Sequence, residues 1–533
     1  MKRNVHALLI ASLVQVAPLG CLRRPGTAPA AAPSEAAAPA SSSTANGVRV
    51  VDIQAILAAL PDGERWVRHV NEDLLRFWGT ETALGNPVGN FPTYRCNDGS
   101  LYDEKAPCPE LKNADRGIVK LERDYTRSKS RQVYAYGVAY HLTGDEKYLG
   151  HAIAGADWLI THAVDRYGAA SWFEGGAPAP ANLQRTSQDL AYAATGIAFV
   201  YYLTRDAKYL DQVVKLKKHI FSTYFDPSWG ILRWVREANA DGDDVNQKEL
   251  VSQLDQIYGY LLWTTMALPQ GPLAEEWTRD LKSLAVAMRN QFFGETYGLY
   301  WGAITDVAHH NLADQKNQEN PHTDFGHSIK TLWLTYRIGL LTGDVSLVDF
   351  ARPRMQAILD VAYIEDTGSW ARGYKPSAPG SSDWIIDPNK EWWSLAELDQ
   401  TSATLALVDP IFAEKLPRTY AYWFEHMVDH EHGDVWHMVK ADGNTPDLSF
   451  PKQHSWKNAF HVFEHALIGY LTGQALHGLP ITLNYAFKGR SVPKSLHPYL
   501  YLGEVSSTQA NGTFTTPSLA TYTPTRVTYR VLR

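Results

Sequence analysis

The stretch "LTGDEKYL", residues 142–149, recurs along the chain, and this recurrence decides the fold. Related stretches are "LTRDAKYL" (203–210), "LTGDVSLV" (341–348) and "LTGQALHG" (471–478), and each follows an apolar, aromatic-rich segment that we expect to be helical. The copies start at residues 142, 203, 341 and 471, so the two later intervals are about twice the first. This spacing predicts a two-helix hairpin of about 60–70 residues as the repeating unit.

Such a hairpin buries its apolar faces only by packing on neighbouring hairpins. Residues from about 60 to 475 accommodate about six of these units, and six hairpins can close into a ring. We therefore predict an all-α fold, an (α/α)6 barrel over residues 49–478. The alternative is an open solenoid, in which ionisable groups on the inner helices would share no cavity.

The pattern changes after Gly478. The stretches "LPITLNYAFKG", "HPYLYLGEV" and "TRVTYRVLR" are short, rich in strand-forming residues and separated by Pro and Gly. We expect residues 479–533 to form a small β-containing appendage. Nothing in this segment points to chemistry.

Composition narrows the function. The chain has 533 residues with a formal net charge of −7 and a pI near 6.3. It has no Lys/Arg-rich run, so nucleic acid is not an expected partner. The 17 Trp and 28 Tyr suit a site that stacks on sugar rings, although packing in the core accounts for most of them.

The N-terminus has the features of an export signal over residues 1–21. A basic start precedes an apolar run, residues 5–19, that is short for a membrane span and is interrupted by Pro18. "PLGC" resembles a bacterial lipoprotein acceptor with Cys21 as the lipidated residue, but Pro18 stands where Leu is usual. Residues 22–48 are rich in Ala, Pro and Ser and are predicted to be a disordered linker. We expect an exported protein, periplasmic, envelope-bound or secreted, with a lipid on Cys21 as its only membrane attachment.

Cys96 and Cys108 are the remaining cysteines, in "RCNDGSLYDEKAPCP". They flank a run of turn residues, and in an exported chain this arrangement predicts a disulfide that closes a loop. A zinc site built from two lone cysteines is the less favoured alternative.

The stretch "TDFGHSIKTLWL", residues 323–334, predicts a helix that is apolar on nearly every side. At about 100° per residue, His327 and Lys330 share one face, opposite a face that contains Phe325 and Ile329. A helix that is apolar all round is normally buried, so its two ionisable groups need a partner, water or a chemical role.

Two further predicted helices repeat this design. "KEWWSLAELDQTSATL" (390–405) places Trp393 and Glu397 one turn apart, and "SWKNAFHVFEHALIGYL" (455–471) places His461 opposite an apolar face. A single histidine on a half-buried helix is more often a core residue than a catalyst. Three such stripes in different hairpins favour one shared cavity.

Four stretches resemble the motifs of the N-acylglucosamine 2-epimerase and cellobiose 2-epimerase family. They are "SKSRQVYAYGVAYHLTGD" (128–145), "GHSI" (326–329), "KEWWSLAE" (390–397) and "WKNAFH" (456–461), in the order of the family and over residues from about 120 to 475. The resemblance implies an (α/α)6 barrel that inverts C2 of a small sugar or short oligosaccharide, or interconverts aldoses and ketoses. It also implies the catalytic residues Arg131, His327 and His461 and the substrate-binding residues Trp392, Trp393 and Glu397.

These residue types suit the reaction, and no cofactor or metal is expected. Removing a weakly acidic proton beside a carbonyl near neutral pH needs a base such as imidazole. Epimerisation takes the proton from one face of C2 and returns one to the other, so His327 and His461 would stand on opposite walls. Arg131 would stabilise the negative charge of the enediolate intermediate.

The sequence departs from the family pattern at three positions. Lys330 stands where the cellobiose branch has glutamate, Glu464 where it has arginine, and Gln256 near the place of an additional histidine. We expect these residues to contact the substrate or shape its pocket. Because the charges of Lys330 and Glu464 have changed together, we predict that the two form an ion pair at the cavity floor.

Three alternatives stay open. "HVFEH" (461–465) fits the H-x-x-E-H pattern of a zinc metallopeptidase. A glycoside hydrolase or lyase on the same barrel would need two carboxylates, for which Glu397 and Glu464 are available. A non-catalytic sugar-binding lipoprotein would explain the departures from the family pattern.

Overall fold

The computed structural model describes most of the chain. It covers residues 44–45, 48–49 and 51–533, apart from residues 116, 181–184, 239–242, 244, 296, 305–323, 379–380, 382 and 490. The expected export signal (1–21) with Cys21 lies outside the described residues, as does most of the expected linker (22–48). In that linker the described part is the paired strands β1 (Thr44–Ala45) and β2 (Val48–Arg49).

Six helical segments form the inner layer of a barrel. They are buried along most of their length, including many of their polar residues. These segments are α6 (Thr126–Thr143), α8 (Ser187–Thr204), the continuous run α10 (Leu250–Gln256), η3 (Ile257–Leu261) and α11 (Leu262–Ala267), α14 (Phe325–Thr342), α16 (Trp392–Ala406) and α18 (Phe460–Leu476).

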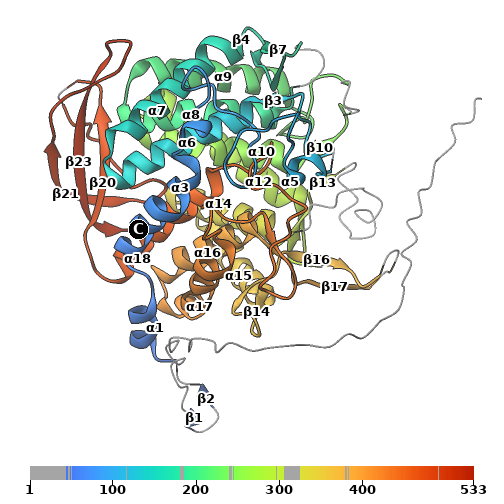
Figure 1. Ribbon diagram of the computed structural model, residues 1–533. Coiled ribbons are helices and arrows are strands. Elements are labelled where there is room, and N and C mark those ends of the chain that lie inside the picture. Colours follow the sequence, from blue (N-terminus) through green and yellow to red (C-terminus); the bar gives the residue numbers. More distant parts are fainter. Residues whose placement is uncertain are drawn as a thin grey trace, which may run out of the picture.

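Amphipathic helices alternate with them along the chain and cover them from outside (Figure 1). This outer layer consists of the run α2 (Gly63–Arg68), η1 (His69–Leu74) and α3 (Leu75–Trp78), then α7 (Glu146–Trp158) with η2 (Leu159–Ala163), α9 (Ala207–Tyr224), α12 (Pro272–Phe292), α15 (Val345–Ala362), and α17 (Leu416–Tyr422) with η5 (Trp423–Met427).

The inner layer closes into a ring. Helix α6 packs on α8, α8 on α10 and η3, α14 on α16, α16 on α18, and α18 returns to α6. Lys330 of α14 joins the two halves of the ring, because its Nζ lies 3.8 Å from the centre of the Tyr258 ring in η3. The predicted (α/α)6 barrel is confirmed, and the contact between α18 and α6 excludes the open solenoid.

The repeated sequence marks where an inner helix ends and an outer helix begins. Gly144 (φ 75°) and Gly343 (φ 68°) end α6 and α14 in the left-handed conformation that glycine adopts without strain. The aspartates that follow, Asp145 and Asp344, cap the next helix by accepting a backbone N–H. The fourth copy differs, because it lacks this aspartate and α18 continues through Gly473.

The C-terminal segment forms an antiparallel sheet against the barrel. Strands β20 (Ile481–Phe487), β23 (Thr521–Leu532) and β21 (Gly503–Ala510) lie in that order, and the short β22 (Phe514–Thr515) also pairs with β23. Strand β20 packs on α6, α8 and α18, and the sheet stands at one side of the helical body (Figure 1). It covers the C-terminal ends of inner helices, since Lys488 N donates to Thr204 O at the end of α8.

Short pairs of antiparallel strands precede or join the helices at the opposite end of the barrel. They include β3 (Asp124–Tyr125) with β6 (Trp172–Glu174), β10 (Lys248–Glu249) with β13 (Ala303–Ile304), β16 (Gly373–Pro376) with β17 (Trp384–Asp387), and β18 (Lys390–Glu391) with β19 (Met438–Val439). In the described part of the chain, no helix is long and apolar enough to span a membrane.

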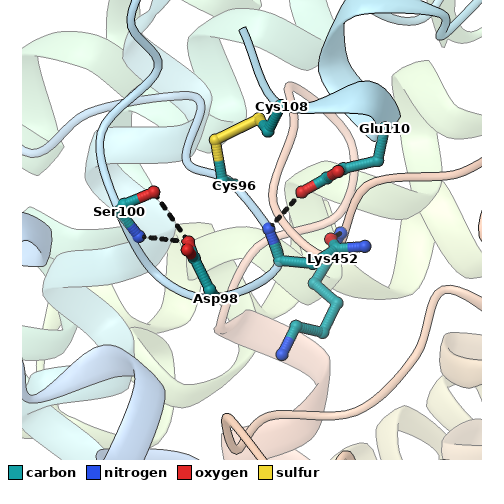
Figure 2. Close-up of a disulfide and its surroundings, with 7 residues drawn as sticks. Cys96, Asp98, Ser100, Cys108, Glu110 and Lys452 are labelled. Atoms are coloured by element: carbon teal, nitrogen blue, oxygen red, sulfur yellow. Dashed lines mark hydrogen bonds between the residues drawn. A yellow bond between two sulfur atoms is a disulfide. The ribbon is translucent and has the colours of Figure 1, made fainter. Parts of the chain in front are cut away.

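The predicted disulfide between Cys96 and Cys108 is formed (Figure 2). Its loop is held from within, since Asp98 accepts two hydrogen bonds from Ser100 and Glu110 accepts one from the backbone of Asn97. Asn97 in turn accepts a hydrogen bond from the backbone N–H of Lys452. The loop therefore braces the segment that leads into α18.

Candidate active site

A cavity of about 1100 Å³ lies at the N-terminal ends of the inner helices. Six of the residues singled out from the sequence line it, and all stand in the first two turns of their helices. They are Arg131 on α6, His327 and Lys330 on α14, Trp392 and Trp393 on α16, and His461 on α18. The separate hairpins thus bring their unusual polar residues to one place.

His327 is fixed by the residue that starts its helix. Asp324 caps α14 by accepting the backbone N–H of His327 through Oδ1 at 2.6 Å, and its Oδ2 lies 2.7 Å from His327 Nδ1. An ionised Asp324 makes Nδ1 the protonated nitrogen, so Nε2 becomes the proton acceptor. The ring of Trp393 stands 4.5 Å from the imidazole between centres.

His461 has the same kind of support from another helix. Its Nδ1 lies 3.2 Å from Glu397 Oε1 and 3.2 Å from the hydroxyl of Tyr258. Burial lowers the pKa of His461 to about 3 despite the nearby Glu397, so the ring is neutral near pH 7. A neutral imidazole is the form that can accept a proton.

Glu397 lies behind the cavity wall and has no exposed surface. Besides His461, it receives the amide of Gln400 at 3.3 Å and the ammonium of Lys330 at 3.7 Å. Burial alone would raise the pKa of Glu397, but Lys330 and His461 together hold it below the ordinary value. In this arrangement Glu397 orients His461, whereas the sequence suggested contact with the sugar.

The predicted ion pair between Lys330 and Glu464 is wrong. Lys330 pairs with Glu397 because α14 packs directly on α16, whose first turns point at the same floor. Glu464 is instead bonded to two tyrosine hydroxyls, Tyr258 at Oε2 and Tyr499 at Oε1, the latter at 2.5 Å. Tyr499 belongs to the C-terminal appendage, in which the sequence indicated no chemistry.

Arg131 lies on the cavity wall beside α18. Its guanidinium stacks on Tyr192, 3.8 Å from the ring centre, and donates to the carbonyl of Trp456 at 3.3 Å. This stacking fixes the plane of the guanidinium while the cavity stays within its reach.

Gln256 does not line the cavity. Its amide donates to the carbonyls of Ser187 and Ser252, and its oxygen accepts the hydroxyl of Tyr260. The expectation that Gln256 contacts the substrate is therefore not met. Two residues further along, η3 turns Tyr258 rather than Gln256 toward the site.

Sequence reasoning missed several polar groups on the wall. His437 and His454 are hydrogen-bonded, with 3.0 Å between Nδ1 and Nε2, and both pKa values fall because the rings are buried. Glu249 lies at the start of α10, and burial raises its pKa to about 7. These three residues stand in loops or short strands, where no helical periodicity marks them. Asp324 could have been found, because it occupies the N-cap position three residues before His327.

The H-x-x-E-H pattern does not form a metal pair. His465 has Nε2 3.2 Å from Asp399 and its ring packed against Trp423, whereas His461 contacts Glu397 and Tyr258. Among the described residues near the cavity, Glu397, His461 and Glu464 do bring one ligand atom each within 4.8 Å of the others. In this structure the two carboxylates of the group have Lys330, Tyr258 and Tyr499 as partners.

The fold and site together define a class: an (α/α)6 barrel whose cavity carries two histidines on separate inner helices, each held at Nδ1 by a carboxylate. The chain is 23% identical to the cellobiose 2-epimerase of Bacteroides fragilis over 388 residues, which cover 68% of this chain and 90% of that protein. No family model matches the chain.

Solved structures show the same barrel. A cellobiose 2-epimerase from Bacillus thermoamylovorans superposes with a TM-score of 0.61 at 16% identity and covers 77% of this chain and 98% of its own. A D-mannose isomerase superposes with a TM-score of 0.62 at the same identity and with the same coverage of both chains. These comparisons support the resemblance to the N-acylglucosamine 2-epimerase and cellobiose 2-epimerase family on which the site prediction rests.

Proposed function

We propose that the protein is a carbohydrate 2-epimerase or aldose–ketose isomerase that removes and returns a proton at C2 of a reducing sugar. One observation carries the proposal: His327 and His461 line a single cavity, and each has a carboxylate at Nδ1, Asp324 and Glu397 respectively. The similar epimerases and isomerase support the same class of reaction.

In the proposed reaction, one imidazole takes the C2 proton of the open-chain sugar, and the electron pair moves onto the carbonyl oxygen as an enediolate. Arg131 stabilises that negative charge. The other imidazole, which must carry a proton on Nε2 when the turnover begins, then gives that proton to the opposite face of C2, which yields the epimer. If the first imidazole returns the proton to C1 instead, and the hydroxyl on C2 passes its proton to the oxygen on C1, the product is a ketose.

Trp393 lies beside both bases and suits a stacked sugar ring. Its ring centre lies 4.5 Å from that of His327 and 5.9 Å from that of His461. A planar apolar surface beside two proton acceptors holds a sugar by its CH face while leaving C2 within reach of both.

The test is incubation of the full-length protein with a panel of reducing sugars in D2O. We expect deuterium at C2, seen by NMR, together with new epimers or ketoses. A panel that shows neither exchange nor products would overturn the proposal.

The alternative function, a glycoside hydrolase, would need two carboxylates that flank the bond to be cleaved. Glu397 and Glu464 are both fully buried and lie together beneath His461, so they do not flank a bond in the cavity. We therefore expect no release of reducing ends from oligosaccharides.

We also propose that the protein is exported and acts in the periplasm or cell envelope. The basic and apolar start of the chain and the predicted disulfide partners Cys96 and Cys108 support export. Labelling with a radioactive fatty acid tests the attachment of lipid to Cys21, with Cys21→Ala as the unlabelled control.

A further inference from the structure

The floor of the site is built partly by the C-terminal appendage. Tyr499, between β20 and β21, is fully buried and reaches into the barrel to donate its hydroxyl to Glu464. Its backbone has φ 57°, a left-handed conformation that is unfavourable for tyrosine. The conformation is held by a hydrogen bond from Tyr499 N to the hydroxyl of Tyr202 on α8. A strained residue held in this way indicates that its position matters.

Two buried carboxyl groups share this floor with one lysine. Glu397 and Glu464 have no exposed surface, and their nearest oxygens lie within 4.8 Å of each other. The ammonium of Lys330 stands 3.7 Å from Glu397. Two ionised carboxylates at this separation repel each other strongly when they are buried. One lysine therefore balances one anion, and the second carboxyl group keeps its proton.

The hydrogen bonds identify which carboxyl group is neutral. Glu397 is surrounded by donors: the ammonium of Lys330, the amide of Gln400 and the ring of His461. Glu464 meets the hydroxyls of Tyr258 and Tyr499, which accept as readily as they donate. Tyr258 has one hydrogen but contacts both glutamates, so a proton on Glu464 lets Tyr258 direct its own hydrogen to Glu397 at 3.1 Å.

We propose that Glu464 is a neutral carboxylic acid and that Tyr499 is its positioning residue. Tyr499 donates to Oε1 of Glu464, Glu464 donates from Oε2 to Tyr258, and Tyr258 donates to Glu397. This chain leaves Glu397 as the single anion that holds His461. The proposal rests on the proposed function for its catalytic consequence, and it makes the C-terminal appendage a working part of the sugar site.

The ionisation of the two groups agrees with this assignment. Burial and then the charge of Glu397 raise the pKa of Glu464 to about 8, whereas the pKa of Glu397 is lowered. The titratable groups that face Glu464 come from five helices and the appendage: Tyr134 on α6, Tyr258 on η3, Lys330 on α14, Glu397 on α16, His461 on α18, and Tyr499 and Tyr501 on the appendage.

Infrared spectroscopy of the intact protein tests the protonation state without reference to activity. At pH 6 we expect carbonyl-stretch absorption of protonated carboxylic acids, to which Glu249 also contributes because burial raises its pKa to about 7. The part of this absorption that is missing in Glu464→Gln belongs to Glu464 and fades as the pH rises through about 8. Tyr499→Phe moves the midpoint upward, because it removes a donor that stabilises the carboxylate. Tyr501→Phe is the matched control: it removes a buried hydroxyl of the same segment, one that bonds Thr404 rather than Glu464.

Kinetics test the positioning role. Tyr499→Phe is expected to lower kcat for C2 exchange about tenfold with little change in KM, while Tyr501→Phe leaves both unchanged. Glu464→Gln, which keeps size and neutrality, is expected to recover most of the activity that Glu464→Leu loses. If the wild type and Glu464→Gln show the same absorption of protonated acids at pH 6, or if the midpoint is unshifted in Tyr499→Phe, the proposal is overturned. A wild-type protein without C2 exchange overturns the proposed function, and the difference in absorption still decides the protonation of Glu464.

Discussion

Glu397 Oε1 lies 3.2 Å from His461 Nδ1 and 3.7 Å from Lys330 Nζ, so one buried carboxylate contacts both a cavity-lining histidine and a buried lysine. This geometry explains the departure from the family pattern at Lys330 without assigning the lysine to the substrate. Where the cellobiose branch has a glutamate, Lys330 supplies a positive charge. This charge stabilises the carboxylate of Glu397, which lies behind His461.

Glu397→Gln is expected to impair both stability and catalysis. It leaves the ammonium of Lys330 buried without its anion, which costs about 3–5 kcal/mol, and it removes the acceptor that fixes the tautomer of His461. Chemical denaturation measures the first effect and C2 exchange the second. Unchanged stability would show that Lys330 finds another partner.

The double variant Lys330→Met with Glu397→Gln is expected to recover stability relative to Glu397→Gln alone. A neutral side chain of similar length removes the unpaired charge, and residues in direct contact couple by about 0.5–3 kcal/mol. The same cycle between Lys330→Met and Glu464→Gln should show a smaller coupling, because those two side chains form no direct ion pair. Equal couplings in the two cycles would contradict the observed pairing.

Stability is expected to depend on pH through Glu464. Its pKa is raised by burial and by Glu397 from 4.5 to about 8, so the folded protein retains a proton that the unfolded chain releases above pH 4.5. The stabilisation that Glu464 contributes to the folded protein is therefore fully present below pH 4.5 and is lost as the pH rises toward 8. The free energy of unfolding of Glu464→Gln, measured by chemical denaturation, should change less between pH 5 and 8 than that of the wild type. An equal change in the two proteins would refute the assignment.

Removal of the disulfide is expected to weaken the segment before α18. The bridge spans 12 residues, a loop for which constraint of the unfolded chain contributes about 2–4 kcal/mol. Arg95, beside the bridge, donates to Gln453 at 2.7 Å, so Cys96→Ser with Cys108→Ser should also raise KM for the sugar. Thermal unfolding and initial rates measure the two effects, and the reduced wild-type protein is the control.

The two ends of the chain are expected to respond differently to truncation. A chain without residues 1–46 should fold cooperatively and keep its activity, because the removed segment has a composition that suits a linker rather than a core. A chain that ends at residue 478 should not, because it loses Tyr499 and strands packed on α6, α8 and α18. Circular dichroism during thermal unfolding distinguishes these outcomes.

The sequence predicted the barrel because its repeats have local physical causes. Gly144 and Gly343 end helices, and Asp145 and Asp344 start the next ones, so the same few residues mark the same junction. Helical periodicity likewise placed His327 and His461 on inward faces. These features depend on neighbours in sequence, which a pattern can reveal.

The partners of those residues depend on distant parts of the chain. Nothing near Glu464 in the sequence indicates that Tyr499 donates a hydrogen bond to it. Lys330 pairs with Glu397 rather than Glu464 because α14 packs on α16. His437 and His454 meet through a loop without periodicity. Such contacts are set by the closure of the ring and by the appendage, which sequence spacing does not encode.

The most direct test of the two-base account is C2 proton exchange in D2O by His327→Asn and His461→Asn, compared with the wild type on the best sugar of the panel. We predict that each variant folds normally and loses epimerisation or isomerisation by at least about 100-fold, as expected for removal of a general acid–base. Near-wild-type turnover in either variant would contradict the account.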